Sequence, residues 1–218
     1  MDERTQDPRA GQRATFVVLR TGTPDAADRC LAGMARQARE HHRGLPGFVS
    51  ARLHREDAGR AAVLRTLWDR TAATGPEAAV SSLRTLGEEP GVGGVFVFDG
   101  VSAAGLAGPA MGDPPGKVAV AVRHLHHAEA MKGLLGLLAA SGEWKRHFPG
   151  FISATPYLGN DGRTFVNYPM WTGDSAYRAW MADARIAEGQ DEIALLEAAP
   201  PEYLVCTVTD QVDRRGSV

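Results

Sequence analysis

Short apolar runs alternate with longer amphipathic segments along this chain of 218 residues. The short runs are rich in β-branched residues or alternate between apolar and polar positions, as strands do, and the longer segments carry apolar side chains at helical spacing. In the first half, this pattern predicts a strand, a helix, a hairpin of two strands, a helix and a strand, over residues 15–20, 24–43, 48–54, 61–68, 75–86 and 92–98. The order of elements is βαββαβ.

The second half repeats the first. Residues 45–51 (LPGFVSA) return as residues 148–154 (FPGFISA), at a spacing of 103 residues. We expect the register to hold without a gap from Arg20 to Trp68 of the first copy, which match Arg123 and Trp171 of the second. A period near 100 residues corresponds to a whole small domain and is too long for a solenoid unit. The chain therefore contains two copies of one fold.

Each copy has the element order of a ferredoxin-like unit, a four-stranded antiparallel sheet with two helices on one face. We predict an α+β protein with a first repeat over residues 14–103, a linker rich in Ala, Gly and Pro over 104–116, and a second repeat over 117–213. Because each sheet has one bare face, the two repeats are expected to cover each other and form one intramolecular, pseudo-dimeric α+β barrel. A ligand pocket is expected between a sheet and its helices or in the barrel interior.

Charge and composition exclude several partner classes. The chain has 24 Lys and Arg against 26 Asp and Glu, so we expect no nucleic-acid partner and no membrane partner. Residues 1–13 lack the apolar core of a secretion signal, and no apolar run approaches the about 20 residues that span a bilayer. A cytoplasmic location is expected. Cys30 and Cys206 have no metal-ligand spacing and are expected to be small buried hydrophobes.

The second copy carries a group of polar and aromatic residues at short spacing, namely Asn167-Tyr168-x-x-Trp171, Tyr177, the Gly162-Arg163 turn and the run Pro149-Gly150-Phe151-x-Ser153. Together these residues resemble the antibiotic biosynthesis monooxygenases of the dimeric α+β barrel superfamily. The resemblance covers both copies but is sharper in the second. It implies an oxidoreductase that uses dioxygen to oxidise a polycyclic aromatic polyketide phenol or hydroquinone to a quinone, in antibiotic or pigment biosynthesis. It implies no metal and no cofactor besides dioxygen as co-substrate.

The resemblance also implies roles for individual residues. Asn167 and Trp171 correspond to the oxygenation residues of the family, and Tyr177 matches a pocket tyrosine. The other aromatic residues expected to bind the substrate are Tyr157, Tyr168 and Trp180. The first copy has Leu64 where the second has Asn167, although it keeps the tryptophan. One working pocket is therefore expected, in the second copy, with the first copy serving mainly as scaffold.

Two histidines near the end of the first strand of the second copy are candidate bases. His124 and His126 point to one face of an extended strand, and imidazole titrates near neutral pH. We therefore expect His124 to take the phenolic proton, with His126 beside it in the pocket. A metal site is not expected, because no third ligand is evident nearby. His41 and His42, at a helix end, are expected to be solvated.

Other functions are compatible with the same sequence. One is a flavin-assisted oxygenase that cleaves a ring of the same substrate class, with reduced flavin as cofactor. Another is a haem-binding barrel enzyme, for which His124 or His126 would supply the axial ligand. A third is a non-catalytic protein that binds a polyketide intermediate. The sequence also leaves open whether two chains associate as a homodimer.

Overall fold

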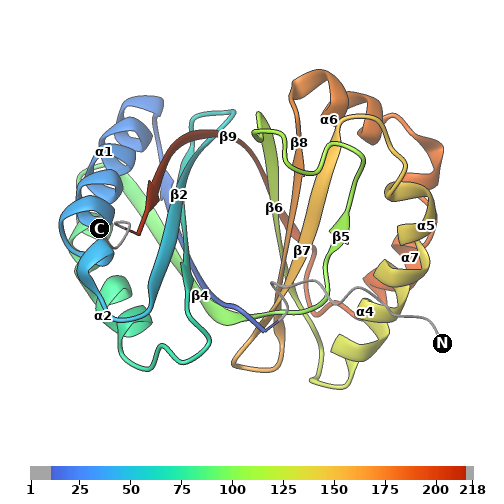
Figure 1. Cartoon of the computed structure of the whole chain (residues 1–218), viewed down its shortest axis with the longest axis horizontal. Helices are drawn as coiled ribbons and strands as arrows, with labels where there is room; N and C mark the ends of the chain where they lie inside the picture. Colours follow the sequence, from blue (N-terminus) through green and yellow to red (C-terminus); the bar gives the residue numbers. More distant parts are fainter. Residues whose placement is uncertain (1–10, 215–218) are drawn as a thin grey trace. The chain divides into compact units, whose positions relative to one another are not determined.

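Each half of the chain runs through the predicted order of strand, helix, hairpin, helix and strand (Figure 1). The computed structural model describes residues 11–214. Elements of the first half are β1 (Arg13–Thr21), α1 (Pro24–Glu40), η1 (His42–Gly44), β2 (Phe48–Glu56), β3 (Ala61–Trp68), α2 (Gly75–Ser82), α3 (Arg84–Gly87) and β4 (Val92–Ser102). Those of the second half are β5 (Leu106–Ala107), β6 (Lys117–His124), α4 (Ala130–Ala140), α5 (Gly142–Lys145), β7 (Phe151–Gly159), β8 (Thr164–Trp171), α6 (Asp174–Met181), η2 (Ala184–Ile186), α7 (Gln190–Ala194) and β9 (Glu202–Asp213).

Two compact units divide these elements. The first unit comprises residues 11–101 and 206–214, and the second comprises residues 102–205. Strands follow the order β4-β1-β3-β2-β9 in the first unit and β9-β6-β8-β7-β5 in the second. The last strand therefore contributes to both sheets, because its later residues pair with β2. The predicted second repeat, residues 117–213, thus differs from the compact unit at its C-terminal end.

The segment predicted as a linker, residues 104–116, is partly built into the second sheet. Strand β5 lies within it and pairs antiparallel with β7. Just after β5, the backbone N–H of Gly108 donates to the carbonyl of Ile152 at 2.9 Å. The segment therefore extends an edge of the sheet as well as connecting the repeats.

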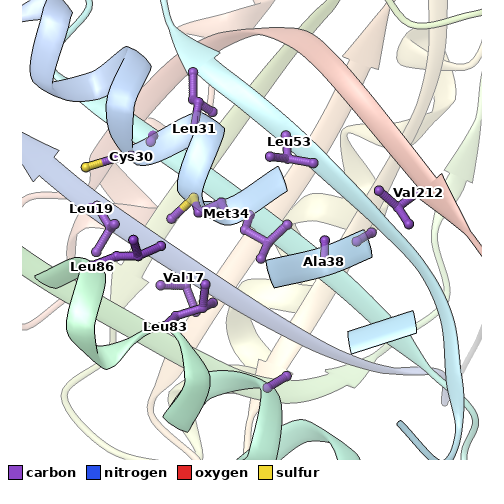
Figure 2. Packing of buried hydrophobic residues seen from close by; sticks show 14 of the residues in the cluster. Val17, Leu19, Cys30, Leu31, Met34, Ala38, Leu53, Leu83, Leu86 and Val212 are labelled. Atoms are coloured by element: carbon purple, nitrogen blue, oxygen red, sulfur yellow. The ribbon is translucent and has the colours of Figure 1, made fainter. Parts of the chain in front are cut away.

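The helix-facing side of the first sheet is filled with apolar side chains. Helix α1 begins where Thr23 caps it, since the Thr23 hydroxyl accepts from the N–H of Ala26 at 3.3 Å and Pro24 starts the first turn. Figure 2 shows side chains of α1 meeting those of the sheet and of α3 in one cluster, which includes Val17, Leu19, Met34, Ala38, Leu53, Leu83 and Leu86.

Strand β6 is shifted by one residue relative to its counterpart β1. Arg20 of β1 pairs with Ala61. Thr164 matches Ala61 in the second copy, and it pairs with His124 and not with Arg123. The second copy has one residue fewer between this strand and its hairpin, so the gap-free register predicted from Arg20 and Arg123 is wrong over β6. Every residue of this strand therefore faces the opposite side from the one that the 103-residue spacing assigns to it.

Other expectations can be compared directly with the structure. Cys30 and Cys206 are both buried and unbridged, as predicted. Within residues 11–214, no helix combines the length and the apolar character needed to cross a bilayer.

Two histidines of the first unit are fully buried, and one of them was expected to be solvated. His42 lies under α2, where its Nε2 is 2.9 Å from the Ser82 hydroxyl. Burial, with His41 nearby, lowers the pKa of His42 to about 4. Burial, with Arg65 nearby, lowers the pKa of His54 to about 3. Each imidazole is therefore neutral in the folded protein at pH values where an unfolded histidine takes up a proton.

We expect the protein to lose stability as the pH falls from about 6.5 to about 4. In this window the unfolded chain binds protons at His42 and His54 and the folded chain does not, so protonation favours unfolding, by about 3 kcal/mol for His42 at the lower end. Urea unfolding as a function of pH should show a shallower fall for His42→Gln than for the native chain. His147→Gln, at an exposed histidine, is the control. An unchanged slope in His42→Gln would contradict the assignment.

Candidate active site

The pairing of β8 with its two neighbours decides which of its side chains face the helices. Asn167 pairs with Ala121 of β6 and Pro156 of β7. Because side chains alternate between the faces of a strand, Asn167 shares a face with Phe165 and Trp171. Both aromatic residues pack in clusters that contain helix residues. The amide and the indole therefore lie on the same, helix-facing side of the second sheet.

Asn167 and its two cross-strand partners, Ala121 and Pro156, form a row of three side chains across the sheet. These side chains are smaller than those of the matching row in the first unit. There Leu64 occupies the position of Asn167 and pairs with Val17 and Leu53, and all three are buried in the continuous cluster. In the second unit the same positions hold an amide, an alanine and a proline. Asn167 is only half-buried, although β8 is a central strand. Less side-chain volume thus fills the second unit at this row.

Two apolar clusters lie at the ends of this region. The tryptophan cluster contains Ala119, Phe151, Trp171 and Trp180, with Trp144, Phe148, Ala154 and Tyr177 packed against it. The leucine cluster contains Leu125, Ala130, Leu134, Phe165 and Ile193. Along β8, Asn167 lies between Phe165 of one cluster and Trp171 of the other, so a polar group interrupts the apolar surface that faces the helices.

The indole N–H of Trp171 is buried and has no hydrogen-bond partner within residues 11–214. In the first unit, the equivalent indole of Trp68 donates to the hydroxyl of Thr15 at 3.1 Å. Ala119 occupies the position of Thr15, because each lies two residues after the residue that pairs with its tryptophan. The methyl group of Ala119 cannot accept a hydrogen bond. A buried N–H without an acceptor costs about 1–3 kcal/mol. This donor is therefore available to an oxygen atom of a ligand.

Helix α6 brings two further predicted residues to Trp171. Tyr177 and Trp180 are three positions apart and so share a face of the helix. Their ring centroids lie 5.0 Å and 5.5 Å from that of Trp171, both edge-on. Trp180 also stacks on Phe151 at 4.8 Å. Tyr177 thus lies beside the indole as predicted, and Trp180 is a packing residue of the tryptophan cluster. The catalytic role of Tyr177 stays a prediction.

Tyr157 and Tyr168 lie on the other face of the sheet. Tyr157 pairs with Val166, and Tyr168 pairs with Thr155. Both strand positions alternate with that of Asn167, and both tyrosines are buried. The sheet therefore does not bring them to the face of Asn167, because the two-residue period of a strand separates them, and their role in binding substrate stays a prediction.

His124 and His126 are not brought to Asn167 either. His124 is exposed and pairs with Thr164, on the face opposite to Asn167, with its Nδ1 3.4 Å from the Thr164 hydroxyl. His126 is exposed beyond the end of β6. The one-residue shift of β6 is the reason, since it turns Arg123 toward the helices. Among the described residues, no group of three His, Cys, Asp or Glu side chains is placed to hold a metal ion.

Two cations on the helix-facing side were missed from the sequence. Arg123 is buried, forms an ion pair with Glu197 and donates to the hydroxyl of Tyr203 at 2.8 Å. Lys145 of α5 is half-buried, and its ammonium donates to the hydroxyl of Ser141 at 2.5 Å. Burial, followed by the charge of Arg123, lowers the pKa of Lys145. An arginine ending the apolar run VAVAVR was the one signal in the sequence.

Part of the chain is similar in sequence to a known monooxygenase. No family model matches the chain. The tetracenomycin-F1 monooxygenase of Streptomyces glaucescens is 39% identical over 64 residues, which are 29% of this chain and 55% of that protein. The chain therefore spans about half the length of this curated relative.

Solved structures share the fold over nearly the whole chain. An anthrone oxidase-like protein superposes with a TM-score of 0.79 at 14% identity, over 96% of this chain and 97% of its own. An uncharacterised ferredoxin-fold protein from Listeria monocytogenes, related to antibiotic biosynthesis monooxygenases, has a TM-score of 0.51 at 12% identity, over 93% and 97%. These likenesses confirm the fold class, an α+β chain of two ferredoxin-like repeats.

The chain is thus similar in part of its sequence to a monooxygenase, and in its fold to a protein related to antibiotic biosynthesis monooxygenases. Its second unit carries Asn167, Trp171 and Tyr177, the residues in which the sequence resembles that family. Its first unit keeps the tryptophan but satisfies it with Thr15 and fills the row beside it with leucine. The two units thus share one order of elements and differ in the residues that surround the tryptophan.

Replacing Ala119 by threonine should give the Trp171 indole the acceptor that Thr15 provides to Trp68. We expect the free energy of unfolding of Ala119→Thr to exceed that of Ala119→Val by about 1 kcal/mol, because the two side chains have the same shape and differ by one hydrogen-bond acceptor. Urea unfolding measures the difference. Equal stabilities would mean that the indole N–H already has a partner.

Proposed function

We propose that the protein is a cofactor-independent monooxygenase that uses dioxygen to oxidise a polycyclic aromatic polyketide phenol or hydroquinone to a quinone. The observation that carries the proposal is a half-buried amide and a partnerless buried indole N–H on one face of one sheet, where the first unit has Leu64 and a satisfied tryptophan. The likeness of part of the chain to a tetracenomycin-F1 monooxygenase supports the substrate class.

The small row around Asn167 suits a flat ring. The alanine and proline neighbours of Asn167 are smaller than the valine and leucine of the first unit, and the tryptophan cluster provides an apolar surface on which an aromatic substrate can pack. Burial of the ring there excludes water from the reacting carbon, which protects a reactive intermediate. Sheet and helices of the second unit together therefore define the proposed binding surface.

Dioxygen has a triplet ground state and reacts slowly with closed-shell molecules, so the substrate itself must supply electrons. A phenolate can do this, because its ring is electron-rich. Addition of oxygen at the ring carbon gives a peroxide, and loss of water from the peroxide gives the quinone. Overall, one phenol and one O₂ give one quinone and one water, so no outside reductant is needed.

Asn167 and Trp171 supply neutral hydrogen-bond donors for this sequence. In the proposed complex, the indole N–H and the amide N–H donate to substrate oxygen atoms that become more negative as the phenolate and then the peroxide form. Donors that are already oriented stabilise such charge without reorganisation, and each contributes a large part of the rate. Tyr177 packs edge-on against Trp171 at 5.0 Å and so fixes the orientation of the indole.

We expect Asn167→Leu to lower turnover by about 10²-fold or more, because it removes one oriented donor and restores the side chain of the first unit. The assay measures oxygen uptake and quinone absorbance on an anthrone or naphthol substrate, without added flavin. Leu64→Met, at the matching position of the first unit, should fold and turn over like the native chain.

Three results would count against the proposal. Native turnover in Asn167→Leu would remove the amide from the mechanism. Oxygen uptake that depends on added reduced flavin would replace the cofactor-free reaction by a flavin-assisted one. Tight binding of the aromatic compound with no oxygen uptake would indicate a binding protein.

The two tryptophans offer a matched pair of substitutions. Trp171→Phe should lower turnover about 10²-fold with little loss of stability from hydrogen bonding, because the indole N–H has no partner among the residues that the structure describes. Trp68→Phe should leave turnover unchanged and lower stability by about 1 kcal/mol, because it breaks the bond to Thr15. Turnover and urea unfolding of both variants check the pair; the reverse pattern would place the working site in the first unit.

A further inference from the structure

We propose that Lys145 forms an anion subsite on the helix-facing side of the second sheet and holds the aromatic substrate there as its phenolate. The inference rests on the proposed function and deepens it, because it identifies the group that keeps the substrate in the form that reacts with dioxygen. Lys145 is the residue of α5 nearest in sequence to β7.

The side chain of Lys145 lies inward. Its ammonium is half-buried, donates to the Ser141 hydroxyl at 2.5 Å and lies 5.7 Å from the centre of the Trp144 ring. Trp144 packs against the tryptophan cluster. The ammonium is also close enough to the buried Arg123 to feel its charge. Arg123 pairs with Phe165 across β6 and β8, in the row next to that of Asn167. Lys145 is thus on the side of the sheet that carries the amide.

Charged groups around Lys145 leave its ammonium uncompensated. Arg123 is neutralised by Glu197 in a buried ion pair. Arg185 lies 4.4 Å from the centre of the Trp144 ring and is paired with Asp183. Among the described residues, no carboxylate lies within ion-pair distance of Lys145. A half-buried cation whose neighbours are already paired favours an anion at this place.

The anion that fits is an oxygen attached to an aromatic ring. Trp144 offers ring surface beside the ammonium, and the side chains beside Asn167 are small, which suits a flat molecule. A free phenol has a pKa near that of tyrosine, about 10, so it is almost wholly protonated at neutral pH. An ammonium in a partly desolvated site lowers that pKa, because an opposite charge nearby favours the ionised form. Binding then releases the phenolic proton to the solvent.

The test uses alizarin, a hydroxyanthraquinone whose colour changes when its phenol ionises. Bound to the native protein, its phenol should titrate at least about one unit below its pKa in solution. Lys145→Met should return the titration toward the solution value and weaken binding of the phenolate at least about tenfold. Lys145→Arg should retain most of the shift. Lys132→Met, at an exposed lysine of α4, should behave as the native chain.

A second dye tests whether Lys145 binds a phenolate or a carboxylate. Anthraquinone-2-carboxylate has no phenol, and its affinity should change less than that of alizarin in Lys145→Met. A loss confined to the carboxylate dye would mean that Lys145 recognises a carboxylate of the substrate, which overturns the phenolate assignment. An unshifted titration in the native protein, or the same shift in Lys145→Met, would overturn the subsite.

These readouts need no oxygen and no turnover, so they fail separately from the proposed function. A shifted alizarin titration in a protein that consumes no oxygen would support the subsite and contradict the oxygenase. The opposite result has two parts: oxygen uptake that falls in Asn167→Leu, and an alizarin titration in Lys145→Met that equals that of the native chain. It would support the oxygenase and contradict the subsite.

Discussion

The cross-strand register of β8 is the constraint on which the candidate site depends. A slip of one residue would turn Asn167 and Trp171 to the other face of the sheet. The turn between β7 and β8 holds the register, since Asp161 accepts from the backbone N–H groups of Arg163 and Thr164 at 2.9 Å and 2.8 Å. Gly162 completes the turn with φ of 70°, a left-handed conformation that glycine adopts without strain.

The two units fill the helix-facing side of the sheet beside the tryptophan with different residues. In the first, leucine and valine fill the sheet beneath α1, and a threonine accepts from the tryptophan. In the second, smaller residues and an amide replace the aliphatic row, and the tryptophan has no acceptor. The second arrangement sacrifices stability, because it gives up apolar burial and leaves a donor unpaired. Close aromatic contacts among Trp171, Tyr177 and Trp180 offset part of the loss.

Sequence reasoning succeeded where local pattern decides the outcome. The order of strands and helices follows from apolar periodicity, and Trp171 with Tyr177 come together because a strand runs directly into a helix. It failed where the face of a strand depends on distant pairing. Tyr157, Tyr168 and His124 were expected in one pocket with Asn167, yet each lies on the opposite side of the sheet from the amide. One residue fewer between β6 and the hairpin was enough to exchange His124 for Arg123.

By itself, the sequence determined that this protein is a duplicated α+β chain whose second copy differs from the first at Asn167. That information is local, because it lies in the periodicity of each segment and in the comparison of two copies. Only the tertiary structure decided that β9 contributes to both sheets, that Trp171 lacks the acceptor that Trp68 has, and that Arg123 and Lys145 lie on the face of the amide. These facts depend on strand register and helix placement, which arise from contacts between residues far apart in the chain.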